Sequence, residues 1–330
     1  MLSLFPVHAP RFGLSLRHDG MTLVKGRRWW GRPLVMTQVE ERALSPGILV
    51  PSPTEVNITE RSQVVQELRS LARSLRASTV AVSLPVSCAQ LAVFSFDEWP
   101  TGEEERRAVL QWRFQHDEGI AVEESVLGYR VYGARVARGT EAKPDHPSVS
   151  VSVLAAAVRK PIVDQYRAVC EEAGLLPVSI GVSTLQLCDL YRPLLSAEAE
   201  TFLVDWADAG FLFMAFRDGV PVFLRRRVKQ ALSTDRRAAV LASLQYFDDR
   251  FPHRAELAAP QRSSLYMVGA VPVGEGDPAG SSEVLAWMPT GDQTWTVSTR
   301  PAEQQVAAMT KRDVSLSVGG LCALASLVTA

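Results

Sequence analysis

The chain has 330 residues, enough for two domains or one large domain with a substantial buried core. Its 35 basic and 36 acidic residues give a formal net charge of −1, so no overall field attracts nucleic acid or a membrane surface. The four cysteines form no CxxC pair and have no histidine cluster nearby, which argues against zinc and indicates reduced, mostly buried thiols of a cytoplasmic protein: Cys88, Cys170, Cys188 and Cys322.

Residues 12–40 contain three short strand-like runs separated by turn signals, at Asp19-Gly20 and at 26–31. The segment before them, MLSLFPVHAPRFG, lacks the basic-then-apolar layout of a secretory signal, which supports a cytoplasmic location. Trp29-Trp30 lies among arginines in the second turn. Packing on a neighbouring strand explains this pair at least as well as base stacking, a membrane interface or a partner surface.

A helix followed by a strand is predicted next. Residues 59–76 place six apolar side chains on one helical face, and TVAVSLP follows as a strand. The face consists of Val64, Val65, Leu68, Leu71, Ala72 and Leu75. Thr101 and Glu104 match a T-x-x-E capping box, which predicts a second helix that runs to about His116.

Two alternating segments then predict strands, SVLGYRVYGARV and SVSVSVLAAAV, with an exposed loop at 137–147 between them. Pro161 is expected at the first position of a helix that Gly174 ends. PVSIGVS is predicted to be another strand and TLQLCDLY another helix.

Residues 202–229 repeat the layout of the first meander about 190 positions later, with turns at Ala209-Gly210 and Asp218-Gly219. The repetition indicates a duplicated architecture. Asp205 lies inside the apolar run FLVDW, where an ionised carboxylate is costly to bury. It could bind a metal-phosphate complex, act as a base, remain from a decayed site or mark a strand end. Asp208 fits an ordinary turn.

Residues 314–328, VSLSVGGLCALASLV, are continuously apolar or small. A membrane-spanning helix needs about 20 such residues, so a buried terminal helix is the preferred interpretation and a truncated anchor the alternative.

The order of these segments resembles the actin-like ATPases, and among them the PilM-like proteins of the type IV pilus inner-membrane platform. The cytoplasmic part of the GspL-like type II secretion proteins is a more distant likeness. The matching segments are FGLSLRHDGMTLV, VAVSLP, VLAAAVRKPIVDQYRAVCEEAGLLPVSIGVSTLQL, FLVDWADAGFLFMAFRDGVPVFLRRR and DVSLSVGGLCALASL.

The resemblance implies an α/β, duplicated actin-like (RNase H-like) fold with an inserted subdomain in its first half and a shortened second half. The first half would cover residues 1–198, with the insertion at about 84–150. The second would cover 199–330 and end in a helix at 313–328.

The resemblance also implies a nucleotide site whose pattern has changed. The first phosphate loop has Ser15, Leu16 and Arg17 where relatives have aspartate, any residue and glycine, and Thr22 follows in the next strand. Asp205 keeps the aspartate of the second loop, but Ala207 replaces its glycine.

Two further positions belong to this nucleotide site. Asp208 stands where relatives have small hydroxyl residues, and Gly269-Ala270 replaces a glycine pair that lets adenosine approach. These changes imply a degenerate site that does not hydrolyse ATP, with Arg17 paired to Asp205 in place of nucleotide. In the alternative, Thr22 and Asp205 still work in an ATPase that binds Mg-ATP. No metal site is predicted otherwise, because the histidines show no i,i+4 pair.

By resemblance, the chain would be a cytoplasmic adaptor that is peripheral to the inner membrane. It would bind the N-terminal cytoplasmic tail of a PilN-like membrane protein in a groove between its first subdomain and the insertion. Other platform or motor proteins, and a second copy of the chain, are further expected partners. A GspL-like protein with an anchor near residue 314 is the remaining alternative.

Overall fold

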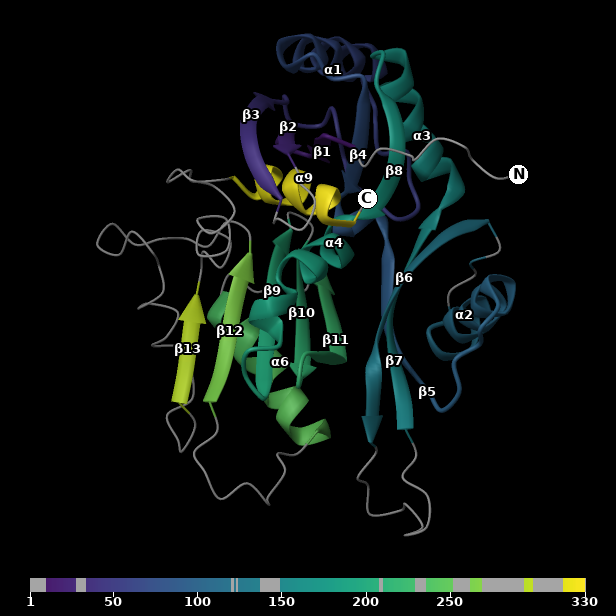
Figure 1. Cartoon of the computed structure of the whole chain (residues 1–330), viewed down its shortest axis with the longest axis vertical. Coiled ribbons are helices and arrows are strands. Elements are labelled where there is room, and N and C mark those ends of the chain that lie inside the picture. The colour runs from purple at the N-terminus through teal and green to yellow at the C-terminus, as the bar shows by residue number, and fades with distance from the viewer. Residues whose placement is uncertain are drawn as a thin grey trace. The chain divides into compact units, whose positions relative to one another are not determined.

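The structure is a computed structural model that describes residues 10–27, 34–119, 122, 124–136, 149–207, 210–228, 236–251, 262–268, 294–298 and 317–329. The described residues form two compact units (Figure 1). Unit 1 combines Met1–Ala89, Lys160–Leu190 and Ala302–Ala330, and unit 2 combines Gln90–Arg159 with Tyr191–Pro301.

A five-stranded sheet forms the centre of unit 1, in the order β3-β2-β1-β4-β8. The first three strands form an antiparallel meander, whereas β4 and β8 run parallel to β1. The strands are β1 (Phe12–Arg17), β2 (Gly20–Arg27), β3 (Val35–Ala43), β4 (Thr79–Leu84) and β8 (Leu176–Val182). The predicted first meander and the two later strands are confirmed.

Unit 2 contains a second sheet with the same strand order and the same strand directions, β11-β10-β9-β12-β13. Its strands are β9 (Glu200–Ala207), β10 (Gly210–Arg217), β11 (Val220–Val228), β12 (Arg262–Val268) and β13 (Thr294–Ser298). The repeated meander therefore reflects two sheets of one topology. The predicted turn at Asp218-Gly219 is confirmed, with φ values of 52° and 74° that suit a type I′ hairpin.

A third, antiparallel sheet in unit 2 lies between β4 and α3 in the chain, in the order β5-β7-β6. It consists of β5 (Gln90–Phe96), β6 (Ser125–Val136) and β7 (Val149–Arg159). Helix α2 (Glu103–Asp117) buries Leu110 and Phe114 in the core of this sheet. The helix was predicted correctly, but the capping box was wrong. Gly102 is the N-cap and no side chain caps the helix, so the acidic first turn is its remaining local support.

The helices of unit 1 bury the faces that their periodicity predicts. Helix α1 buries the same six residues that the sequence placed on one face. The helices are α1 (Arg61–Leu75), α3 (Lys160–Glu172), α4 (Ser183–Leu190) and α9 (Val318–Thr329), and a short 3₁₀ turn, η1, covers Val86–Cys88. Helix α3 begins at Lys160, so Pro161, which was predicted to be the first residue of the helix, is its second. All four cysteines are buried and unbridged, as expected.

Helix α9 lies across β1 and β2 (Figure 1). It approaches β1 so closely that a Cβ atom on Gly13 would lie 1.8 Å from the carbonyl oxygen of Ala323. Ser326 Oγ donates to the carbonyl oxygen of Ala81 at 3.1 Å, which fixes the helix against β4 as well. The preferred interpretation of this apolar segment as a buried helix is thus confirmed for 318–329. No helix among the described residues is long and apolar enough to span a membrane.

Helix α6 (Arg236–Arg250) covers one face of the sheet of unit 2. The contact is largely aromatic: Phe247 of α6 packs against Phe202 of β9 with ring centroids 5.4 Å apart and against Phe223 of β11 at 5.9 Å. A short helix, α5 (Arg192–Leu195), precedes β9. Edge-to-face and stacked rings add to the apolar area that this face buries.

Helices α1 and α3 end in the same hydrogen-bonded motif. In α1, the Ala77 amide donates to the Ala72 carbonyl at 2.8 Å, around Arg76 with φ of 55°. In α3, the Leu175 amide donates to the Cys170 carbonyl at 2.9 Å. The left-handed position of α3 is Gly174, with φ of 83°, which confirms its predicted role.

The turn predicted at Asp19-Gly20 lies one residue earlier. Arg17 pairs with Gly20 across the hairpin, so His18 and Asp19 form the turn and Gly20 begins β2. A Cβ on Gly20 would lie 2.6 Å from the carbonyl oxygen of Arg42. The glycine is therefore needed for the close approach of β3. The predicted loop at 137–147, the Trp29-Trp30 pair and residues 313–316 lie outside the described residues.

Candidate functional site

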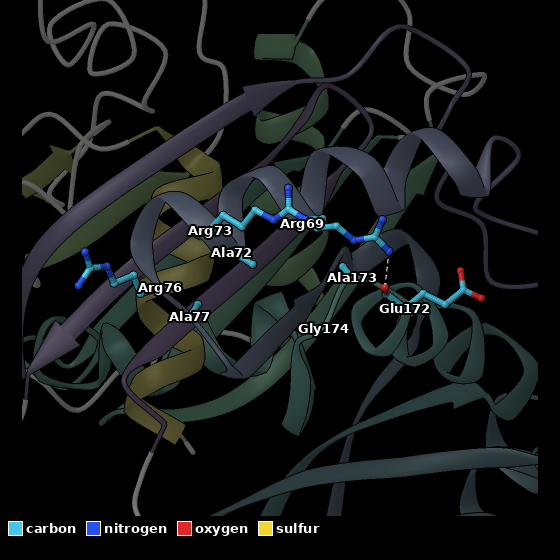
Figure 2. A pocket seen from close by; sticks show the side chains of 8 residues that line it. All are labelled: Arg69, Ala72, Arg73, Arg76, Ala77, Glu172, Ala173 and Gly174. Atoms are coloured by element: carbon cyan, nitrogen blue, oxygen red, sulfur yellow. Dashed lines mark hydrogen bonds between the residues drawn. The ribbon is translucent and has the colours of Figure 1, made fainter.

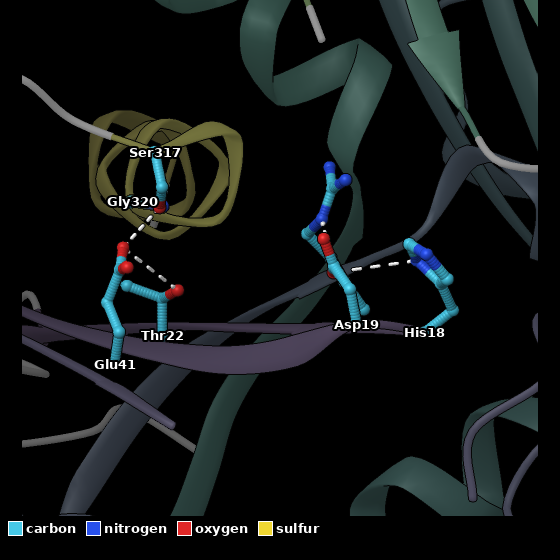
Figure 3. Close-up of polar contacts among 7 residues, drawn as sticks. His18, Asp19, Thr22, Glu41, Ser317 and Gly320 are labelled. Carbon is cyan, nitrogen blue, oxygen red and sulfur yellow. Dashed lines mark hydrogen bonds and ion pairs between the residues drawn. The ribbon is translucent and has the colours of Figure 1, made fainter. Parts of the chain in front are cut away.

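The first predicted phosphate loop is the β1–β2 hairpin, and its two hydroxyl residues are buried. Ser15 lies opposite Thr22 in the register of the hairpin, and Thr22 lies opposite Glu41 of β3. Directly opposed side chains lie on the same face of a sheet, so the three form a polar row across the meander. Thr22 Oγ1 donates to Glu41 Oε1 at 3.5 Å, a long contact (Figure 3).

This polar row ends at the N-terminus of α9. The hydroxyl of Ser317 donates to Glu41 and accepts a hydrogen bond from the Gly320 amide at 3.0 Å (Figure 3). Ser317 is thus the N-cap of the helix, and the Glu41 carboxylate lies where the positive end of the helix dipole favours negative charge. Sequence reasoning missed both residues. The register of the first meander contained the signal for Glu41, because it places that residue opposite Thr22.

Arg17 has a local partner in the turn of the same hairpin. Its Nε donates to Asp19 Oδ1 at 3.2 Å. His18 Nδ1 lies 3.5 Å from the same oxygen (Figure 3). Partial burial disfavours the charged carboxylate of Asp19, but the guanidinium and its hydrogen bond outweigh this and hold the pKa of Asp19 below its usual value. The Arg17 guanidinium, which was predicted to fill the space of the phosphate groups, therefore forms an ion pair with Asp19, two residues away.

The second predicted phosphate loop is the β9–β10 hairpin. Asp205 is a buried residue of β9 that pairs in register with Leu212 of β10 and with Val268 of β12. Its neighbours Val204 and Trp206 belong to the aromatic core under α6. Since successive side chains of a strand alternate, Asp205 lies on the other face. Asp208 and Gly269 lie outside the described residues.

The two hairpins can be compared position by position. Arg17 pairs with Gly20 at the end of the first hairpin, and Ala207 pairs with Gly210 at the end of the second. Ser15 lies two residues before Arg17, and Asp205 lies two residues before Ala207, so Ser15 and Asp205 are counterparts. One half therefore has a hydroxyl where the other has a carboxylate, and neither has glycine two residues later.

In the part of the chain that the structure describes, no three histidine, cysteine, aspartate or glutamate side chains gather into a group that could hold a metal ion.

Comparison with solved structures identifies the fold. PilM of a "PilM-PilN type IV pilus biogenesis complex" superposes with a TM-score of 0.61 over 98% of both chains, at 17% identity. A Bacteroides thetaiotaomicron protein described as having an actin-like ATPase fold and unknown function covers 91% of this chain and 96% of its own length, with a TM-score of 0.52 and 10% identity.

The cytoplasmic domain of EpsL, an inner-membrane component of the type II secretion system of Vibrio cholerae, gives a TM-score of 0.43 at 9% identity, over 93% of this chain and 96% of that domain. No protein-family model matches the sequence, and no curated protein matches it. The matches to PilM and to the Bacteroides thetaiotaomicron protein show that the chain has the actin-like ATPase fold.

Proposed function

We propose that the chain is a PilM-like adaptor of a type IV pilus or related secretion platform, which binds the N-terminal cytoplasmic tail of a PilN-like membrane protein. The observation that supports this best is the match to PilM over 98% of both chains, since the partner in that structure is PilN. The adaptor would be cytoplasmic and would reach the inner membrane through such partners.

In this proposal, the three-stranded sheet with α2 is the subdomain inserted in the first actin-like half. Its strand β6 lies at the edge of the sheet, where it can accept an added strand. Val126 of β6 is 47% exposed and offers apolar surface beside that edge. An extended tail would then bind through backbone hydrogen bonds and small apolar contacts near the insertion.

The adaptor is proposed to have no working ATPase site. The carboxylate of Glu41 lies beside the hydroxyl row that would face a phosphate group, and like charges oppose each other there. The Arg17 guanidinium, which could offset that charge, is paired with Asp19. The groups present in the first hairpin therefore fit Mg-ATP poorly. Asp205 would be the surviving member of the ancestral site.

Titration calorimetry with a synthetic peptide of the PilN-like tail would test the adaptor role. We expect saturable binding by the native chain and none to a scrambled peptide. Val126→Asp should weaken binding, whereas Val50→Asp, at a residue of similar exposure (49%) in unit 1, should leave it unchanged. Failure of the native chain to bind the tail would refute the proposal.

Thermal unfolding with Mg-ATP would test the degenerate site separately. A ligand that binds only the native state at a hundred times its Kd stabilises it by about 2.7 kcal/mol, which a melting curve detects. We expect no shift at millimolar Mg-ATP, either for the native chain or for Arg17→Gly. A shift in the native chain would favour an active ATPase. A shift in the variant alone would show that the arginine is what blocks the site.

A further inference from the structure

Unit 1 has an open pocket of about 610 Å³ between the C-terminal ends of α1 and α3 (Figure 2). Three arginines contribute to it, together with small residues that leave space between them. The lining residues are Arg69, Ala72, Arg73, Arg76, Ala77, Glu172, Ala173 and Gly174. A volume of this size exceeds the share of a single water or ion many times and suits several residues of a peptide or a small organic ligand.

Arg69 and Arg73 lie on one face of α1, at positions i and i+4, and Arg76 follows directly after the helix. Arg69 Nη2 donates to the carbonyl oxygen of Glu172 at 2.8 Å, as Figure 2 shows. The Glu172 carboxylate forms an ion pair with Arg61 and does not neutralise Arg73 or Arg76. Arg73 and Arg76 are exposed, and among the described residues neither guanidinium forms a hydrogen bond or an ion pair. Within the described part of the chain, the pocket therefore carries two uncompensated positive charges.

Arg76 occupies a backbone position that favours glycine. It has φ of 55° in the motif that ends α1, whereas Gly174 occupies the equivalent position of α3. A non-glycine residue in this conformation costs about 1–2 kcal/mol, and such a local cost points to a use for the side chain. Support of the helix C-terminus by basic residues explains Arg73, which lies in the last turn. This support does not explain why Arg76, and not glycine, occupies the left-handed position after α1.

The surroundings select the kind of anion. Both helices present their C-terminal carbonyl groups at the pocket, so a small anion finds no cradle of amide donors there. The solvent face of α1 bears serine and glutamine between the arginines and no large apolar side chain that could insert into a membrane. The pocket is also lined by no aromatic ring that could stack a base. A flexible chain with several carboxylates can reach the guanidinium groups and avoid the carbonyls.

We propose that this arginine pocket, defined by Arg69, Arg73 and Arg76, binds an acidic segment of a partner protein. The carboxylates of the segment form charge-assisted hydrogen bonds with Arg73 and Arg76, and its backbone passes over the small residues between α1 and α3. The site lies within unit 1 and does not depend on the proposed tail-binding function.

Fluorescence anisotropy with a labelled twelve-residue peptide of alternating glutamate and serine would test the proposal, with a glutamine–serine peptide of equal length as the neutral probe. We expect saturable, salt-sensitive binding of the acidic peptide alone. The double variant Arg73→Gln/Arg76→Gln should weaken it roughly tenfold or more. The matched double variant Arg107→Gln/Arg167→Gln removes the same net charge from exposed arginines outside the pocket and should keep most of the affinity.

Arg76→Gly separates binding from stability. Binding should weaken several-fold while the thermal midpoint rises by about 2 °C, because glycine relieves the left-handed conformation. Equal weakening by both double variants would show nonspecific attraction and overturn the proposal. So would unchanged binding in Arg73→Gln/Arg76→Gln. Preferential binding of inorganic phosphate, or of phosphatidylglycerol vesicles, would assign the pocket to a different anion and also overturn it.

Discussion

The two five-stranded sheets have the same strand order, and the first hairpin of each pairs in the same register, but their helices cover them in different ways. In unit 1, α9 packs against a glycine, so that the helix backbone touches the sheet backbone. In unit 2, α6 packs through phenylalanine rings around Phe247. Unit 2 has Leu203 at the position of Gly13, but Leu203 lies on the face of its sheet away from α6, so α9 and α6 cover opposite faces of the repeated sheet. The same sheet topology thus allows a helix to pack closely on a strand backbone or to pack through a layer of aromatic side chains. Substitution of a glycine should damage the first kind of contact, and removal of an aromatic ring should damage the second.

The largest effect is expected in the aromatic layer of unit 2. Phe247→Ala removes a fully buried ring that touches Phe202 and Phe251, and should lower the free energy of unfolding by about 3–5 kcal/mol. Chemical denaturation would measure the loss. Tyr246→Ala, at the half-exposed neighbouring position, should lose less than about 1 kcal/mol. Equal losses in the two variants would contradict the assignment of the core to the Phe247 face.

Gly13→Ala should have the next largest effect, because its Cβ would overlap the Ala323 carbonyl and α9 would have to move. We expect a loss of about 3 kcal/mol, the upper range for an overpacked core. Gly133→Ala in β6 is the control, since its Cβ would meet no atom within 4 Å. Denaturation that shows no difference between these two variants would mean that α9 does not pack closely on β1.

Loss of the α9 cap should have a smaller effect. Ser317→Ala removes the acceptor for the Gly320 amide and the hydroxyl that contacts Glu41, and should lower stability by about 1 kcal/mol. Ser62→Ala, on the exposed face of α1, should change it by less than about 0.5 kcal/mol. If the two side chains act together, Ser317→Ala should lower stability by less in a Glu41→Gln background than in the native chain. Full additivity would show that they act independently.

The smallest effect is expected at the first hairpin, and it depends on pH. The pKa of Asp19 is lowered in the folded state, so its pair with Arg17 adds stability above the ordinary pKa of about 3.8 and loses it as the pH falls through the folded value. The side chain of Asp19 is 56% exposed, which limits the contribution to a few tenths of a kcal/mol.

Asp19→Asn should therefore be slightly less stable than the native chain at pH 7, and the difference should vanish near pH 2. Thermal melts across this range, with 1 M salt as the screening control, would measure it. A difference that is the same at both pH values would rule out the carboxylate as its source.

The sequence alone determined the elements whose signals are local. The buried face of α1 and the turn at Asp218-Gly219 follow from periodicity and turn chemistry within a few residues. The repeated meander also made the duplicated sheets predictable. Local signals failed where two local explanations competed: Thr101 and Glu104 fit a capping box, yet Gly102 is the N-cap and the helix begins at Glu103. Gly20 resembled a turn residue, yet lies in a strand.

Tertiary structure alone decided the contacts that join distant parts of the chain. A hydrogen bond joins Glu41 to Ser317, which lies 276 residues later in the chain, and Gly13 packs against Ala323. The sequence around Glu41 or Gly13 does not indicate either partner. The arginine pocket likewise exists because α1 and α3 end side by side, about a hundred residues apart in the chain. Periodicity shows which side of a helix or strand is buried, but the packing of whole elements decides which residues contact that side.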